Sequence, residues 1–151
     1  ILGAAAALVT VATYLGAGEF YVRFGVLHCL AVAALLLPLF DRWSPLAHLG
    51  LAAVLGAISW PFAQMTGSAW LLPLGLMPPG FRTMDYVPLL PWVGVILIGQ
   101  GAGRWLQGPP PSSLWPELKP LAAIGRWALP IYLLHQPVII PLCWLVANWG
   151  K

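Results

Sequence analysis

The sequence predicts an all-α fold, a polytopic integral membrane helical bundle with about five transmembrane helices. Of its 151 residues, 60% are hydrophobic and 7% are charged, whereas soluble domains carry about 25% charged residues. Apolar stretches of near-bilayer length recur along the chain, and only helices satisfy their own backbone hydrogen bonds within such stretches. We therefore expect a multi-pass integral membrane protein whose first partner is the lipid bilayer.

Five stretches have the length and composition of a transmembrane helix. They are residues 1–17, 24–40, 46–63, 88–106 and 121–149. Ser44 and Pro45 predict the start of the third stretch, with serine as the N-cap and proline at the first helical position. The fifth stretch contains Pro130, Pro137 and Pro141, and we expect these prolines to interrupt it.

Residues 64–87 do not predict a transmembrane helix. Glycines and prolines interrupt this stretch at Gly67, Pro73, Gly75, Pro78, Pro79 and Gly80. They are too many for a continuous helix. The apolar part is too short to cross a bilayer, so we expect it to lie in the interface or to form a re-entrant segment.

The chain is predicted to form one transmembrane domain over residues 1–151. Its first residues are already apolar, with no charged region or cleavage pattern before them, so we expect the chain to be the C-terminal part of a longer one. The net charge of +3 is small and lies in short loops, which gives no support for a nucleic-acid partner. Cys29 and Cys143 lie in apolar stretches and predict free thiols, with neither a disulfide nor a metal site.

His28 and His135 lie well inside predicted transmembrane helices, where an ionisable side chain marks a candidate functional site, and His48 lies close to the start of the third. His28 lies about one turn into the second helix, and a neutral imidazole there is suited to accept a proton from a hydroxyl or an amine. The alternative is a histidine that packs between helices. His135, followed by Gln136, lies near the middle of the fifth helix. We expect His135 to be neutral, hydrogen-bonded and turned toward the bundle; the alternative is a structural tie between helices.

Asp85, Arg126 and Trp92 each have two interpretations. Asp85 precedes the fourth helix, where it is either favoured by the helix dipole or orients a histidine or a sugar hydroxyl. We expect it near His28, because the second and fourth helices start on the same side of the bundle. Arg126 either binds the phosphates of a donor or anchors the chain at the interface. Trp92 either belongs to the interfacial aromatic belt or contacts a substrate.

Four stretches of the sequence resemble segments of one family. They are FGVLH at 24–28, DYVPLLPWVG at 85–94, the glycine-rich end of the same helix at 97–101, and the stretch 125–137, which ends in IYLLHQP. In order and spacing they are similar to the bacterial relatives of heparan-α-glucosaminide N-acetyltransferase, a transmembrane acyltransferase family. The resemblance covers nearly the whole chain.

The resemblance implies transfer of an acetyl or acyl group from a cytoplasmic thioester donor to a sugar hydroxyl or amine on the outer side of a bacterial cytoplasmic membrane. It implies acyl-CoA as a co-substrate, with no cofactor bound tightly. It places residues 64–87 outside and 107–120 in the cytoplasm. The implied catalytic residues are His28, Asp85 and His135, and the implied substrate-binding or donor-binding residues are Arg126, Gln136, Trp92 and Tyr86.

Two other functions are compatible with the sequence. Trp127 and Ala128 stand where the family often has a His-Ser pair, and no position matches the charged opening segment of the family or the histidine that follows it. These departures favour a catalytically inactive relative that serves as an accessory or structural subunit of a larger membrane complex or a homo-oligomer. A small transporter is the least favoured, since it needs charged residues along several helices, and among the charged residues and histidines only His28 and His135 lie well inside them, with His48 close to a helix end.

Overall fold

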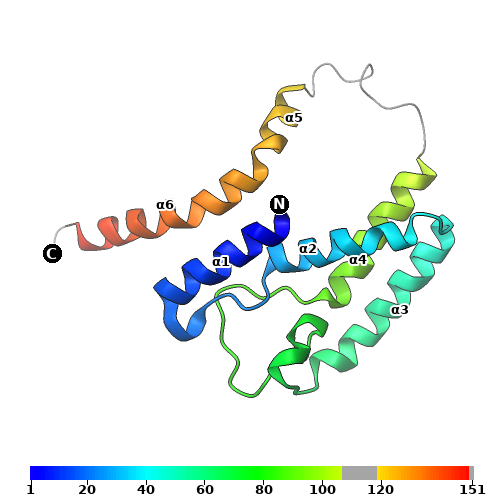
Figure 1. Ribbon diagram of the computed structural model, residues 1–151, viewed down its shortest axis with the longest axis horizontal. Helices are drawn as coiled ribbons and strands as arrows, with labels where there is room; N and C mark the ends of the chain where they lie inside the picture. Colours follow the sequence, from blue (N-terminus) through cyan, green and yellow to red (C-terminus); the bar gives the residue numbers. More distant parts are fainter. Residues whose placement is uncertain (107–118, 150–151) are drawn as a thin grey trace. The chain divides into compact units, whose positions relative to one another are not determined.

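The computed structural model describes residues 1–106 and 119–149 (Figure 1). In chain order its helices and 3₁₀ turns are α1 (Leu2–Ala17), η1 (Gly18–Phe20), α2 (Val26–Leu36), η2 (Leu37–Phe40), α3 (Pro45–Ala63), η3 (Ala69–Leu74), α4 (Leu89–Trp105), α5 (Lys119–Arg126) and α6 (Ala128–Asn148). They form two compact units, Ile1–Gln107 and Gly108–Lys151. The prediction of a single transmembrane domain stays a prediction.

The first four predicted helices are all present, as α1, α2 with its continuation η2, α3 and α4. The start of α3 agrees in detail with the prediction. The hydroxyl oxygen of Ser44 accepts a hydrogen bond from the backbone N–H of Ala47 at 3.2 Å, and Pro45 is the first helical residue. This bond satisfies one of the N–H groups that a helix leaves unpaired at its start.

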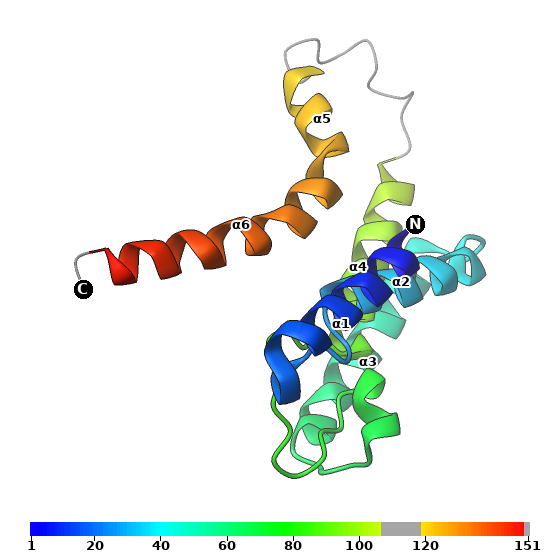
Figure 2. The same cartoon turned by 60° about the vertical axis from the view of Figure 1, so that its left-hand side comes forward.

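The core of the first unit lies where α2, α3 and α4 meet. In both views α3 runs along α4, and α1 packs on α2, which also contacts α4 (Figures 1 and 2). Ala33 of α2 and Val93 and Leu97 of α4 form the buried cluster. Leu51 and Leu55 of α3 pack against this cluster, so it holds α2, α3 and α4 together.

Two glycines of α4 allow α3 to come close. A Cβ atom on Gly94 would lie 3.2 Å from the carbonyl oxygen of Ala52, and one on Gly101 would lie 2.9 Å from the Cβ of His48. Residues seven apart lie on the same face of a helix, so both glycines face α3. His48 is completely buried at this contact, and its Nδ1 donates to the carbonyl oxygen of Ser44 at 2.9 Å.

Residues 64–87 contain no continuous helix, as predicted. The only helical turn described there is η3, and it ends at Gly75, whose φ of 108° lies in the left-handed region that glycine adopts without strain. The backbone N–H of Gly67 donates to the carbonyl oxygen of Met77 at 3.1 Å and closes the segment into a loop. The interfacial or re-entrant placement of this segment stays a prediction.

The structure of the second unit differs from the prediction for the fifth helix. Residues 119–148 are helical but break at Trp127, between α5 and α6. Pro130 does not interrupt a helix, because it is the third residue of α6, where the backbone N–H has no partner within the helix. Within α6 the helix continues through Pro137 and Pro141.

The outer surfaces of the helices are apolar. Within residues 1–106 and 119–149, two helical stretches are long and apolar enough to cross a membrane, Leu2–Phe20 and Pro45–Ala63, and Val26–Phe40 is a shorter apolar helix. Only 11% of the residues in either long stretch are buried in the structure, whereas the core helix of a soluble protein is mostly buried. The chain is therefore all-helical in the part described, with apolar helices that fit a membrane; the five-helix topology stays a prediction.

Candidate active site

The segment that leads into α4 runs beside the segment that leads into α2. Backbone N–H groups of the first donate to carbonyl oxygens of the second, from Met84 to Phe20 at 2.8 Å and from Val87 to Phe24 at 3.1 Å. Phe24 and Tyr86 form an isolated parallel bridge between these bonds. This pairing carries Asp85 to the first turn of α2, although the two lie 59 residues apart in sequence.

Asp85 caps α2. Its Oδ2 accepts a hydrogen bond from the backbone N–H of Val26 at 2.9 Å, and its negative charge lies at the positive end of the α2 dipole. A Cβ atom on Gly25 would lie 2.1 Å from Oδ2, so only glycine at position 25 leaves room for the carboxylate. The dipole interpretation of Asp85 is therefore supported, but the helix that Asp85 stabilises is α2 and not its own α4.

His28 is hydrogen-bonded through both ring nitrogens. Its Nδ1 accepts from the backbone N–H of Gly25 at 3.3 Å, and its Nε2 lies 3.1 Å from the hydroxyl oxygen of Thr10. That hydroxyl gives its single proton to the carbonyl oxygen of Val22 at 2.8 Å, so it accepts from His28. The network assigns the neutral tautomer with hydrogen on Nε2 and ties α1 to α2.

The structure thus brings His28 and Asp85 together, as predicted. The adjacent backbone N–H groups of Gly25 and Val26 bind the imidazole and the carboxylate respectively, and the two side chains interact electrostatically. Arg82, three residues before Asp85 in the sequence, makes no ion pair with Asp85 or with another residue that the structure describes.

A cavity of about 340 Å³ lies beside this network. Thr10 and Phe24 line it, and the Phe24 ring centroid is 5.7 Å from that of His28. Tyr21, Arg23 and the exposed Trp70 complete its aromatic and basic wall. Sequence reasoning did not identify Thr10 or Arg23. The available signals were a hydroxyl within an apolar stretch and a basic residue directly before FGVLH.

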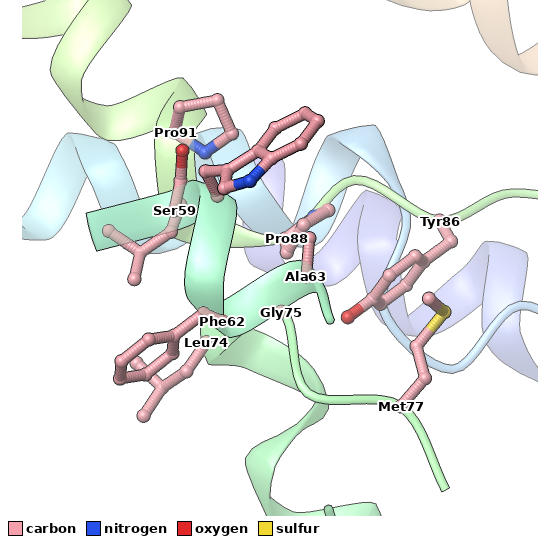
Figure 3. A pocket seen from close by; sticks show the side chains of 11 residues that line it. Ser59, Phe62, Ala63, Leu74, Gly75, Met77, Tyr86, Pro88 and Pro91 are labelled. Carbon is pink, nitrogen blue, oxygen red and sulfur yellow. The ribbon is translucent and has the colours of Figure 1, made fainter. Parts of the chain in front are cut away.

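Tyr86 lines a second, mostly apolar cavity of about 330 Å³ (Figure 3). The figure shows its ring reaching from the segment before Pro88 toward the chain at Gly75, and its hydroxyl donates to the carbonyl oxygen of Leu72 at 2.8 Å. Burial raises the pKa of Tyr86 above its usual value of 10, because a phenolate loses its hydration there. The same hydrogen bond holds η3 against the segment that carries Asp85.

Trp92 does not line either of these cavities. It lies in the first turn of α4, and 48% of its surface is exposed. This exposure agrees with the interfacial interpretation of Trp92, and its predicted substrate contact stays a prediction.

The remaining predicted residues belong to the second unit. Arg126 ends α5 with an exposed side chain. The Nδ1 of His135 donates to the carbonyl oxygen of Tyr132, one turn earlier in α6, so the predicted hydrogen bond exists but is local. Gln136 belongs to α6, and its side chain lies outside the described residues. In the part of the chain that is described, no group of three or more His, Cys, Asp and Glu side chains is placed to hold a metal ion.

Comparison with known families identifies the class of protein that this fold and site define. Residues 1–137 match the catalytic domain of heparan-alpha-glucosaminide N-acetyltransferase. Because the match spans most of the chain, the chain belongs to this membrane-associated acetyltransferase family, which confirms the resemblance seen in its four sequence stretches. No curated protein and no solved structure matched the chain.

Proposed function

We propose that this chain transfers an acetyl group from a cytoplasmic thioester donor of the acyl-CoA type to a sugar hydroxyl or amine on the outer side of the membrane. One observation carries the proposal: His28 and Asp85, from two separate family stretches, meet at the start of α2 beside a cavity. Membership of the acetyltransferase family supports the class of reaction.

The proposed reaction uses His28 as the general base. The acceptor hydroxyl or amine replaces Thr10 as the partner of Nε2, and the imidazole takes the tautomer with its lone pair on that nitrogen. Nδ1 then carries the hydrogen and gives up the hydrogen bond that it accepts from the backbone N–H of Gly25. Nε2 then accepts the proton of the acceptor while the acceptor oxygen or nitrogen attacks the acetyl carbonyl carbon. The carbonyl–sulfur bond breaks, and the leaving thiolate takes the proton from the imidazolium. The nearby Asp85 carboxylate stabilises the imidazolium while it exists.

The second unit supplies the proposed donor contacts. The planar guanidinium of Arg126 suits the phosphates of coenzyme A, and its exposure on α5 leaves it accessible. Gln136 and His135 are proposed to act near the thioester, and Tyr86 and Trp92 near the acceptor. The apolar outer surfaces fit a bilayer and also a homo-oligomer or a larger complex.

A second candidate function is that of an inactive relative, an accessory subunit of a membrane complex. It is favoured by the hydrogen bonds of the site, since both nitrogens of His28 and one oxygen of Asp85 already hold the backbone and Thr10 in place. In that case the network serves only to fix α1, α2 and α4.

One experiment distinguishes the two candidate functions. The purified full chain in proteoliposomes is given acetyl-CoA and glucosamine, and the acetylated sugar is measured by mass spectrometry. We expect transfer by the unchanged chain and a loss of about 10²-fold or more for His28→Gln. Asp85→Asn should also slow transfer, because the imidazolium loses its neighbouring negative charge. Asp41→Asn is the matched control, since Asp41 lies in the turn after η2, where its Oδ1 accepts a hydrogen bond from the Nε2 of Gln100 at 2.7 Å. No transfer by the unchanged chain favours the accessory subunit.

A further inference from the structure

Two aromatic rings orient Arg23, which makes no hydrogen bond to another residue that the structure describes. Its guanidinium carbon lies 4.8 Å from the ring centroid of Tyr21 and 5.4 Å from that of Phe81. Its Nε is buried and has no partner in the described chain. Two aromatic contacts therefore orient the planar guanidinium, while its N–H donors have no hydrogen-bond acceptor among the described residues.

A second guanidinium faces the same space. Arg23 and Arg82 both line a cavity of about 440 Å³, together with Phe81, Glu19 and residues 78–80. Among the described residues neither arginine makes an ion pair, and the carboxylate of Glu19 pairs with neither. The cavity thus presents two positive charges against one negative charge.

Arg23 also lines the cavity that contains Thr10, the hydroxyl partner of His28. The two cavities therefore adjoin, with Arg23 and Ala69 in the lining of both. A ligand with a negatively charged group on the two guanidinium groups can extend past Arg23 toward Thr10. Both volumes lie in the range of small-molecule sites, about 300–1,000 Å³.

We propose that Arg23 and Arg82 bind an oxyanion, a carboxylate or a phosphate, that the acetyl acceptor carries. The acceptor class is therefore an anionic sugar or sugar-containing lipid, and this inference rests on the proposed function. Guanidinium suits this role because its N–H donors match both oxygens of a carboxylate or a phosphate.

Binding is tested without the acetyl donor, on the full chain in nanodiscs of phosphatidylcholine, by titration calorimetry with inorganic phosphate and with glucuronate. We expect saturable binding that Arg23→Gln and Arg82→Gln each weaken by about tenfold or more. Arg42→Gln, which removes one charge from the turn after η2, is expected to leave the Kd unchanged. Equal affinity in the Arg82→Gln variant, or equal weakening by Arg42→Gln, would overturn the proposal.

If Arg23→Gln does not fold, Arg82→Gln decides the outcome, because Arg82 is exposed and has no partner to lose in the part of the chain that the structure describes. Nanodiscs that also contain phosphatidylglycerol distinguish a lipid headgroup from a soluble acceptor as the source of the oxyanion. If phosphatidylglycerol weakens phosphate binding, and Arg82→Gln removes this effect, the oxyanion is that of a lipid headgroup. If phosphatidylglycerol has no effect on phosphate binding, the oxyanion belongs to a soluble acceptor.

The kinetic readout separates this inference from the proposed function. Arg82→Gln should raise KM for an anionic acceptor with little change in kcat, and should leave KM for glucosamine unchanged. His28→Gln should keep phosphate binding and lose transfer. Transfer without any phosphate or glucuronate binding overturns this inference alone. Binding without transfer overturns the proposed function, and with it the assignment of the oxyanion to an acetyl acceptor, but leaves the oxyanion site itself.

Discussion

Gly25 and Asp85 occupy the same small space at the start of α2: a Cβ on Gly25 would lie 2.1 Å from the Oδ2 of Asp85 and 2.7 Å from its Cγ. The carboxylate can reach the backbone N–H of Val26 only because residue 25 has no side chain. The FGVLH and DYVP stretches are therefore physically dependent on each other, since the glycine of one makes room for the aspartate of the other.

Gly25→Ala is expected to displace Asp85 and to destabilise the chain by about 1–3 kcal/mol, the usual cost of overpacking. Thermal unfolding in detergent measures the effect. In an Asp85→Ala background the same substitution should cost much less, because the closest clashing atoms are gone. Gly50→Ala is the control, since no atom lies within 4 Å of a Cβ at that helical position. Equal costs in both backgrounds would contradict the dependence.

Gly101→Ala is expected to push α4 away from α3, because the new Cβ would lie 2.9 Å from the Cβ of His48, an atom that cannot rotate away. We expect a loss of about 1–3 kcal/mol in unfolding free energy. Gly99→Ala in the same helix meets nothing within 4 Å and should be neutral or stabilising by up to about 1 kcal/mol. A lower stability for Gly99→Ala than for Gly101→Ala would show that the helix contact is wrong.

Tyr86→Phe is expected to lower stability by about 1 kcal/mol at neutral pH, because it removes the hydrogen bond to Leu72. The pKa of Tyr86 is raised in the folded chain, so above about pH 10 the unfolded chain releases this proton more readily than the folded one. The free energy of unfolding of the unchanged chain should then fall with rising pH. Its excess over the free energy of unfolding of Tyr86→Phe should shrink. A difference that grows above pH 10 would contradict the burial of the phenol.

His28→Ala and His135→Ala are expected to differ in their effect on stability. His28 joins α1 to α2 through Thr10, whereas His135 bonds a carbonyl one turn earlier in its own helix. Removing His28 should cost about 1–3 kcal/mol, since Gly25 and Thr10 lose a partner, and removing His135 should cost less. If His135→Ala is the more destabilising in thermal unfolding, His135 makes a tie that its local bond does not account for.

Much of the fold could be predicted from the sequence because its signals are local. The lengths of the apolar stretches predicted the positions of α1 to α4, and Ser44 with Pro45 predicted the start of α3. The break between α5 and α6 was predicted at the wrong residue, because a proline within the first turn of a helix looks in the sequence like a proline that interrupts one.

The sequence predicted which residues of the site lie near one another, but not which atoms they contact. Alternating helices put His28 and Asp85 at the same end of the bundle. The atoms that they bind depend on the pairing of residues 83–87 with residues 20–26, which no local pattern specifies. Thr10 and Arg23 gain their roles only through contacts with distant segments, so the sequence did not single them out.

The most direct test of the proposed mechanism is a double-mutant cycle in the acetyl-transfer assay, with His28→Gln, Asp85→Asn and the pair together. If the two residues act as one unit, the double variant should be no slower than His28→Gln alone, since Asp85 acts only through the imidazolium. Independent, multiplying losses in kcat would contradict the account, as would full activity in His28→Gln.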